Sequence, residues 1–87
     1  MEEILSFEEY KYWQGSWFTD KYTEKQQWLL YLVYKFEKEY GEPLISFTSS
    51  LYNIEWLKQR VEGLSERIKI SNLDEILKAI ADVKEEL

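Results

Sequence analysis

The apolar residues of this chain recur mostly at three- and four-residue spacing, which is the period of an amphipathic helix. The pattern is densest between residues 23 and 41, which read TEKQQWLLYLVYKFEKEYG. One face of this segment consists of Leu29, Leu32, Val33, Phe36 and Tyr40. Large apolar side chains also cover most of the remaining circumference, namely Trp28, Leu30, Tyr31 and Tyr34. The pattern predicts a central helix with neighbours on several sides.

Local signals mark both ends of this central helix. Thr23 and Gln26 stand three positions apart, as in a capping box, where each side chain binds the backbone N–H of the other residue. Gly41 suits the left-handed conformation that follows many helices, and Pro43 stands where a helix cannot continue. We therefore expect the helix to begin after Thr23 and to end at Gly41.

The first 22 residues form a separate unit before the central helix. Ser6 and Glu9 make a second capping box, which predicts a short helix over residues 7–14 that ends at Gly15. Residues 16–22 show no helical period, so we expect a loop carrying aromatic side chains there.

A third helix is predicted from about residue 49 to residue 62. Its buried face would consist of Leu51, Ile54, Leu57 and Val61. Gly63 is expected to end this helix. The alternative is a longer, kinked helix that tolerates Gly63 in its interior.

Residues 67–70 alternate polar and apolar side chains, and residues 44–47 form a short apolar run. The two segments could pair as a minimal two-stranded ribbon, which would need helices behind it to be stable. Ser71 with Asp74 is expected to start the last helix. Its buried stripe comprises Leu73, Ile76, Leu77, Ile80, Val83 and Leu87. The sequence thus predicts an all-α fold, a compact four-helix bundle with a short first helix, in a single domain over residues 1–87.

The composition excludes several kinds of chemistry. The chain has no cysteine and no histidine, which removes disulfides, Cys/His zinc sites and nucleophilic catalysis by Ser-His or Cys-His pairs. The three glycines are scattered, so no phosphate-binding loop is present. Neighbouring carboxylates such as Glu8 and Glu9 point about 100° apart on a helix and cannot form a catalytic pair. We expect no enzymatic activity, no cofactor and no bound metal.

The charge of the chain favours a basic partner over a polyanion. Seventeen acidic and eleven basic residues give a net charge of −6, which a small domain also needs for solubility. The N-terminus lacks the features of a signal peptide, and no apolar run approaches the ~20 residues that span a bilayer. We expect a protein without membrane contact, located in the cytoplasm.

The best candidate for a binding surface is the mixture of aromatic and acidic residues between positions 7 and 22. Trp and Tyr are enriched at the centres of protein interfaces, and carboxylates beside them would suit a partner rich in Arg and Lys. We expect at least two of the four aromatic candidates to be exposed, although each ring could instead cover the central helix. The predicted partner-binding residues are Glu8, Glu9, Tyr12, Trp13, Trp17, Phe18 and Asp20.

An alternative interpretation uses the locally basic segment 58–69. A helix-turn-helix would place the third helix in the major groove, as in a DNA- or RNA-associated accessory factor of replication or transcription. The candidate residues are Lys58, Arg60, Arg67 and Lys69. Lys58 and Arg60 face different directions on a helix, and the acidic remainder of the chain repels DNA, so direct nucleic-acid binding is the less favoured prediction.

A small, acidic, aromatic-rich domain without Cys or His is similar in composition to many phage- and virus-encoded inhibitors, including anti-CRISPR proteins. This resemblance involves no motif and assigns no residue. It implies an inhibitor or regulator of a nucleic-acid-handling protein, located in the host-cell cytoplasm. A homodimer is also expected, because a bundle with one short helix would leave part of the central helix poorly covered.

Overall fold

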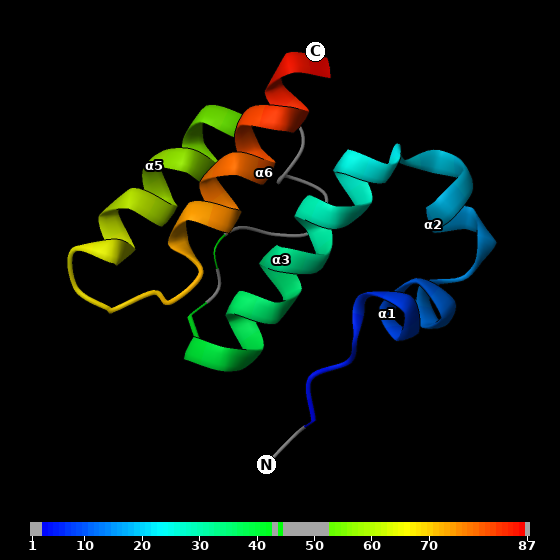
Figure 1. Ribbon diagram of the computed structural model, residues 1–87, viewed down its shortest axis with the longest axis horizontal. Coiled ribbons are helices and arrows are strands. Elements are labelled where there is room, and N and C mark those ends of the chain that lie inside the picture. The colour runs from blue at the N-terminus through cyan, green and yellow to red at the C-terminus, as the bar shows by residue number, and fades with distance from the viewer. Residues whose placement is uncertain (1–2, 43, 45–52, 87) are drawn as a thin grey trace.

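The computed structural model describes residues 3–42, 44 and 53–86. This part of the chain contains the helices α1 (Phe7–Gln14), α2 (Ser16–Lys21), α3 (Glu24–Tyr40), α5 (Ile54–Ser65) and α6 (Leu73–Glu86). α3 crosses the middle of the molecule, α1 and α2 pack on one side of it, and α6 packs on the other with α5 beyond (Figure 1). The described residues form no strand, which confirms the all-α prediction.

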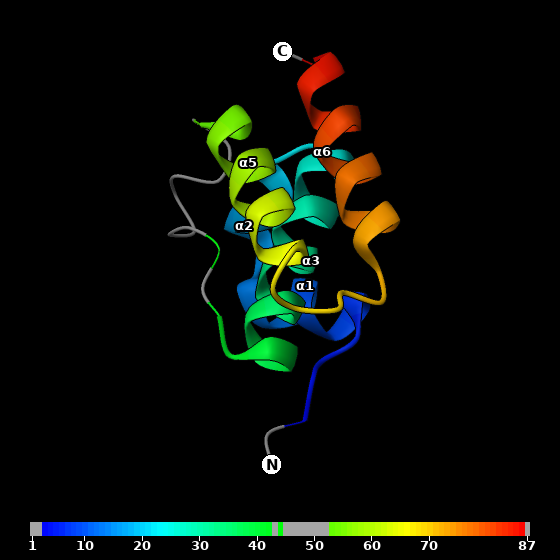
Figure 2. The ribbon, with the colours of Figure 1, turned by 90° about the vertical axis from the view of Figure 1, so that its left-hand side faces the viewer.

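The molecule is flat, with extents of 36 by 36 by 20 Å. Turning the ribbon by 90° brings α5 and α6 to the front, with the other helices behind them (Figure 2). In so thin an arrangement most helices keep one face in contact with solvent. None of the described helices is both long enough and apolar enough to cross a membrane.

The ends of α3 are those that the sequence predicts. Thr23 Oγ1 accepts a hydrogen bond from the Gln26 N–H at 3.2 Å, and the Thr23 N–H donates to Gln26 Oε1 at 2.9 Å. Gly41 adopts φ 69°, and its N–H donates to the Glu37 carbonyl at 2.9 Å. The two capping devices therefore set the length of the central helix.

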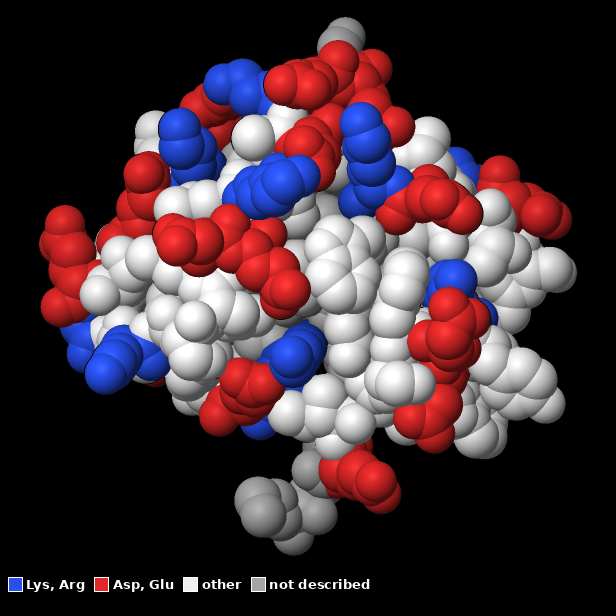
Figure 3. Space-filling model, viewed as in Figure 1, with Lys and Arg blue, Asp and Glu red and all other residues white. Residues whose placement is uncertain are grey.

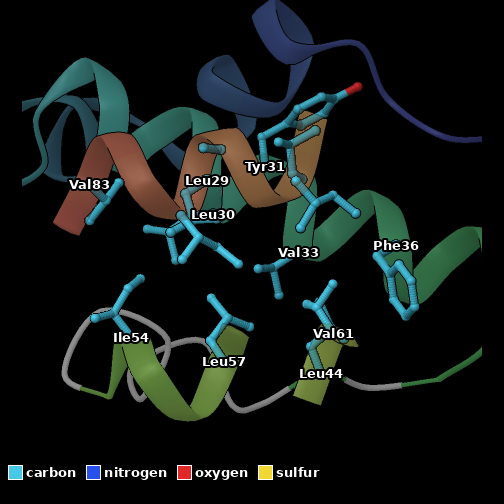
Figure 4. Packing of buried hydrophobic residues seen from close by; sticks show 14 of the residues in the cluster. Leu29, Leu30, Tyr31, Val33, Phe36, Leu44, Ile54, Leu57, Val61 and Val83 are labelled. Carbon is cyan, nitrogen blue, oxygen red and sulfur yellow. The ribbon is translucent and has the colours of Figure 1, made fainter. Parts of the chain in front are cut away.

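The hydrophobic core surrounds α3. Ile54, Leu57 and Val61 of α5 point toward apolar side chains of α3, and Val83 of α6 joins the same cluster (Figure 4). The largest fully buried side chains are Phe18, Phe36, Leu29, Leu30, Leu32, Leu57, Leu64, Ile76, Val61 and Val83. Seven residues of α3 are buried, on several sides of the helix, which confirms the prediction that it has more than one neighbour.

The predicted loop over residues 16–22 is wrong, because Ser16–Lys21 forms the short helix α2. Gly15, at φ 85° and ψ 178°, ends α1 and lets the chain change direction at once. The Phe18 N–H then bonds to the Gly15 carbonyl at 3.2 Å, and the Tyr22 N–H bonds to the Phe18 carbonyl at 3.1 Å. Complete burial of Phe18 holds this helix, which is too short for a hydrophobic period to appear in the sequence.

The third helix differs from the prediction at both ends. α5 begins at Ile54 rather than near residue 49, and Leu51 lies outside the described residues. The helix continues through Gly63 to Ser65, so the predicted end at Gly63 is wrong and the longer helix is observed. The physical reason is the burial of Leu64, which the continued helix places in the core with 1% of its surface exposed.

Residues 67–70 of the predicted ribbon form a turn followed by irregular chain. The N–H groups of Arg67 and Ile68 donate to the Leu64 carbonyl at 3.0 and 2.8 Å, so residues 67–70 do not form a strand. Leu44 is buried in the core, whereas residues 45–47 lie outside the described residues.

The last helix, α6, begins one position later than its predicted cap requires. The helix starts at Leu73, so Asn72 and not Ser71 is the residue directly before it. The backbone N–H of Ser71 instead donates a hydrogen bond to Tyr40 Oη of α3 at 3.2 Å. The predicted stripe is otherwise observed. Ile76, Ile80 and Val83 are buried, Leu73 and Leu77 are partly buried, and Leu87 lies outside the described residues.

Candidate partner-binding surface

Four large apolar side chains of the described residues are exposed. Three of them lie between positions 12 and 17: Tyr12 is 80% exposed, Trp13 72% and Trp17 52%. The fourth, Trp56 on α5, is 46% exposed. The expectation that at least two of the four aromatic candidates face solvent is therefore confirmed. Below, the aromatic surface means Tyr12, Trp13 and Trp17.

Phe18 does not belong to this surface, although the sequence placed it there. It is fully buried, and its ring packs edge-on against Tyr10 at a centroid distance of 5.6 Å. Phe18 is therefore a core residue that packs α2 against α1.

The direction of Tyr12 follows from the packing of α1. Tyr10 is buried and stacks on Tyr34 of α3 with ring centroids 4.8 Å apart. Because a helix turns about 100° per residue, Tyr12 points about 160° away from Tyr10 and hence toward solvent. The rings of Tyr12 and Trp13 meet edge to face at 6.0 Å, so the two exposed side chains support each other.

Trp17 stands on the other side of Gly15, in the first turn of α2. The centroid of its ring lies 6.0 Å from that of Phe18 and 6.4 Å from that of Tyr22. Trp17 therefore covers part of the core, while about half of its surface remains exposed. A hollow of about 610 Å³ between α1 and α2 is lined by Glu8, Lys11, Tyr12, Gly15, Ser16 and Thr19. Large uncharged groups protrude over α1 and α2 at the right of the molecule, between separate charged clusters (Figure 3).

The three predicted carboxylates have different roles. Glu8 has a side chain that is 84% exposed, and it pairs with Lys11 at 3.2 Å. Asp20 is exposed on α2. Glu9 is also exposed, but its Oε1 accepts from the Ser6 N–H at 3.1 Å, which completes the capping box of α1. The hydrogen bonds from the backbone and side chain of Ser6 lower the pKa of Glu9.

The candidates of the nucleic-acid alternative are only partly brought together. Arg60 and Arg67 line a hollow of about 330 Å³ on α5, together with Trp56, Gln59, Gly63 and Leu64. Arg60 lies 4.0 Å from Glu42. Lys58 is two positions from Arg60 and points about 160° away from it on the helix. Lys69 is exposed after the helix and does not line the hollow.

Sequence reasoning missed a groove between α1, α3 and α6. Its volume is about 410 Å³, and its lining comprises Phe7, Glu8, Lys11, Glu24, Lys25, Gln27, Trp28, Ala79 and Asp82. The one signal in the sequence is Ala79, a small residue beside the stripe of α6, which leaves room where a larger side chain would fill the space. The charged rim comes from three helices, so spacing along the chain could not reveal it.

The described residues contain no group of three or more Asp, Glu, His or Cys side chains arranged to hold a metal ion. Comparison of the chain with protein-family models, with curated proteins and with solved structures finds no match. A function can therefore be argued only from the surfaces described above.

Proposed function

We propose that this chain is a small protein-interaction module that binds a basic, nucleic-acid-handling protein and inhibits or regulates it. The aromatic surface carries the proposal, because three of the four exposed large apolar side chains of the described residues lie within six consecutive positions. Clustered exposed aromatic rings on a small domain are typical of a partner-binding site.

The size of the aromatic surface suits a specific interface. Each large aromatic side chain can remove about 150–250 Å² from water. The two most exposed rings, Tyr12 at 80% and Trp13 at 72%, would therefore supply roughly 230–380 Å² of the ~800 Å² that one partner buries in a standard interface. A few such side chains carry most of the binding free energy in known interfaces.

The charge of the molecule supports a basic partner. Five acidic and two basic residues lie between positions 3 and 24, and the whole chain carries a net charge of −6. A protein that handles nucleic acid exposes a basic surface for phosphates, and covering that surface would block its function. The compositional similarity to phage- and virus-encoded inhibitors points in the same direction.

Truncating the two most exposed rings tests the proposal. The double variant Tyr12→Ser, Trp13→Ser should change the free energy of unfolding by no more than about 0.5 kcal/mol, because both side chains face solvent. It should weaken binding of the partner by about 2 kcal/mol or more, roughly 30-fold. Partners are identified by quantitative affinity purification from the native source, and the affinity of each purified partner is then measured. Trp56→Ser is the matched control, because it removes an exposed Trp from a different helix.

Loss of the same basic partner from Trp56→Ser, with the double variant unaffected, would move the binding site to α5. A partner with an acidic surface would contradict the proposal altogether. Charge reversal adds a second test: Glu8→Lys with Asp20→Lys should slow association with a basic partner. Glu9 is left unchanged in this test, because its carboxylate caps α1 and its reversal would destabilise the helix.

The second candidate function is nucleic-acid binding through α5. The observation that favours it is the hollow shared by Trp56, Arg60 and Arg67, which offers an aromatic ring and two guanidinium groups. If it is correct, Arg60→Glu with Arg67→Glu should abolish binding to oligonucleotides, whereas Lys58→Glu, on the other side of the helix, should reduce it only slightly. Absence of binding to single strands and duplexes at low salt, where phosphate contacts are strongest, would exclude it.

A further inference from the structure

The groove between α1, α3 and α6 has an aromatic floor. Phe7 of α1 meets Trp28 of α3 edge to face, with ring centroids 5.1 Å apart, and both side chains line the groove. Ala79 of α6 forms the opposite wall and leaves the space of about 410 Å³ open. Uncharged surface lies near the middle of the face shown in Figure 3, with charged side chains around it.

The lining of the groove includes the ammonium groups of Lys11 and Lys25 and carboxylates from three helices. The carboxylates are those of Glu8 of α1, Glu24 of α3 and Asp82 of α6. Glu8 pairs with Lys11 at 3.2 Å, and Asp82 pairs with Lys78 at 3.1 Å. Three carboxylates against two ammonium groups leave the lining with a net negative charge. Aromatic rings beside these carboxylates attract a cation in two ways, through the faces of the rings and through ion pairs.

A cation of the chain itself already uses this floor. The Lys11 ammonium lies 4.5 Å from the centroid of the Phe7 ring and 3.2 Å from Glu8 Oε1. Its side chain is only 26% exposed, so it lies along the surface rather than extending into water. Lys11 thus occupies the ring and carboxylate pair that an incoming cation would use.

We propose that this groove receives an arginine side chain of a basic protein partner, which displaces Lys11 from Phe7 and Glu8. This inference rests on the proposed function and names the chemistry that the partner would insert. Glu8 and Lys11 line both the groove and the hollow beside Tyr12, so a partner on the aromatic surface can reach the groove across one turn of α1. Arginine fits better than lysine, because its planar guanidinium stacks on a ring while binding carboxylates at its edge.

Neutralising the internal competitor gives the sharpest test. Lys11→Gln should bind an oligo-arginine peptide about 3-fold more tightly than Lys21→Gln does, because a cation over an aromatic face contributes modestly at an exposed site. Lys21 is the matched control: its ammonium lies 5.5 Å from the Tyr22 ring, away from the groove, and its neutralisation changes the net charge equally. Binding is followed by calorimetry, and thermal melts confirm that both variants are folded.

A loss-of-binding pair completes the experiment. Glu24→Gln, at the rim, should weaken oligo-arginine binding more than Glu37→Gln, which removes the same charge from the far end of α3. Equal effects within either pair, or equal affinity for oligo-lysine and oligo-arginine, would show that only net charge matters and would overturn the inference.

The outcome is separable from that of the proposed function. If Tyr12→Ser with Trp13→Ser loses a basic partner while Lys11→Gln and Lys21→Gln behave alike, the aromatic surface binds the partner and the arginine site is refuted. If Lys11→Gln alone gains affinity for oligo-arginine and the double variant still binds the partner, the groove binds arginine and the aromatic surface is not the interface.

Discussion

At the scale of single residues, Tyr10 shows how burial couples stability to pH. Its side chain is 4% exposed, among the rings of Phe18, Tyr31 and Tyr34. Removal from water disfavours the charged phenolate and raises the pKa of Tyr10 to about 12. Tyr31 is buried beside it, and the same cause raises its pKa.

The raised pKa of Tyr10 predicts a loss of stability at high pH. The folded-state value lies above the value of about 10 in the unfolded chain, so the stabilising contribution is complete below pH ~10 and is lost as pH rises through about 12. Two units correspond to about 2–3 kcal/mol. Between pH ~10 and about 12, the free energy of unfolding of Tyr10→Phe should therefore fall by about 2–3 kcal/mol less than that of the wild type. Urea denaturation at a series of pH values measures the difference.

Tyr12→Phe is the matched control for this prediction, because it removes the hydroxyl of an exposed tyrosine from the same helix. Its stability should fall with pH as that of the wild type does. Identical pH dependence of Tyr10→Phe and the wild type would show that Tyr10 does not govern the alkaline transition.

At the scale of helices, the three glycines differ although all three looked like helix ends in the sequence. Gly15 and Gly41 have positive φ values of 85° and 69° and do end helices. Gly63 lies inside α5 without a positive φ, and a Cβ atom built there meets nothing within 4 Å. The backbone of Gly63 therefore does not require glycine.

Gly63→Ala should stabilise the protein by about 0.5–1 kcal/mol, because alanine costs less conformational entropy in a helix. Gly41→Ala should destabilise it, since Gly41 occupies the left-handed region that costs an L-residue about 1–2 kcal/mol. Thermal melts of the two variants measure this difference in sign. Destabilisation by Gly63→Ala would mean that the space around the residue is filled in solution.

The helices that the sequence predicted well are those with strong local signals. The capping boxes that begin at Ser6 and Thr23 are formed by residues three positions apart in the sequence. The starts of α1 and α3 could therefore be predicted without knowledge of the fold. α2 could not, because it depends on burying Phe18 against Tyr10 of the neighbouring helix, and no local pattern encodes how two helices pack. The end of α5 failed for the same reason, since the buried position of Leu64 outweighs the helix-ending tendency of Gly63.

The candidate site shows the same limit. The sequence predicted that at least two of four aromatic side chains face solvent, and the structure confirms this for Tyr12, Trp13 and Trp17. Which ring would be buried depended on the angle between α1 and α2, which no local pattern encodes. The groove depended on three helices meeting at Ala79 and was therefore not predictable from spacing.

At the scale of the whole molecule, the homodimer stays a prediction. Seven residues of α3 are buried within one copy, so burial of the central helix does not by itself require a second copy. Among the described residues, the aromatic surface is the largest group of exposed apolar side chains on which two copies could meet, and a net charge of −6 on each copy opposes that contact.

This opposition predicts that salt acts with opposite sign on the two kinds of association. Screening over about 8 Å at physiological ionic strength should promote self-association and weaken binding of a basic partner. Light scattering across a salt series measures the first effect, and titration with the purified partner measures the second. The double variant Tyr12→Ser, Trp13→Ser should remain monomeric at every salt concentration. Self-association that decreases with salt would indicate a contact between opposite charges instead.

Two hydrogen bonds hold the N-terminal segment before α1 against α3, one at the backbone N–H and one at the carbonyl of Leu5. The Leu5 N–H donates to Tyr34 Oη at 3.1 Å, and Tyr31 Oη donates to the Leu5 carbonyl at 2.7 Å. Both tyrosines belong to α3, so the segment can leave the surface only when these hydrogen bonds open together. The amide hydrogen of Leu5 should therefore exchange slowly with solvent deuterium, although it lies outside every helix.

Tyr34→Phe removes the acceptor and should make the Leu5 amide exchange rapidly, whereas Tyr12→Phe, which removes an exposed hydroxyl, should not. Unchanged exchange at Leu5 in Tyr34→Phe would show that the contact does not protect it. If the amides of α1 accelerate together with Leu5, the segment and the helix detach as one unit. The aromatic surface would then be assembled during only a fraction of the lifetime of the native protein, and its affinity for any partner would be reduced by that fraction.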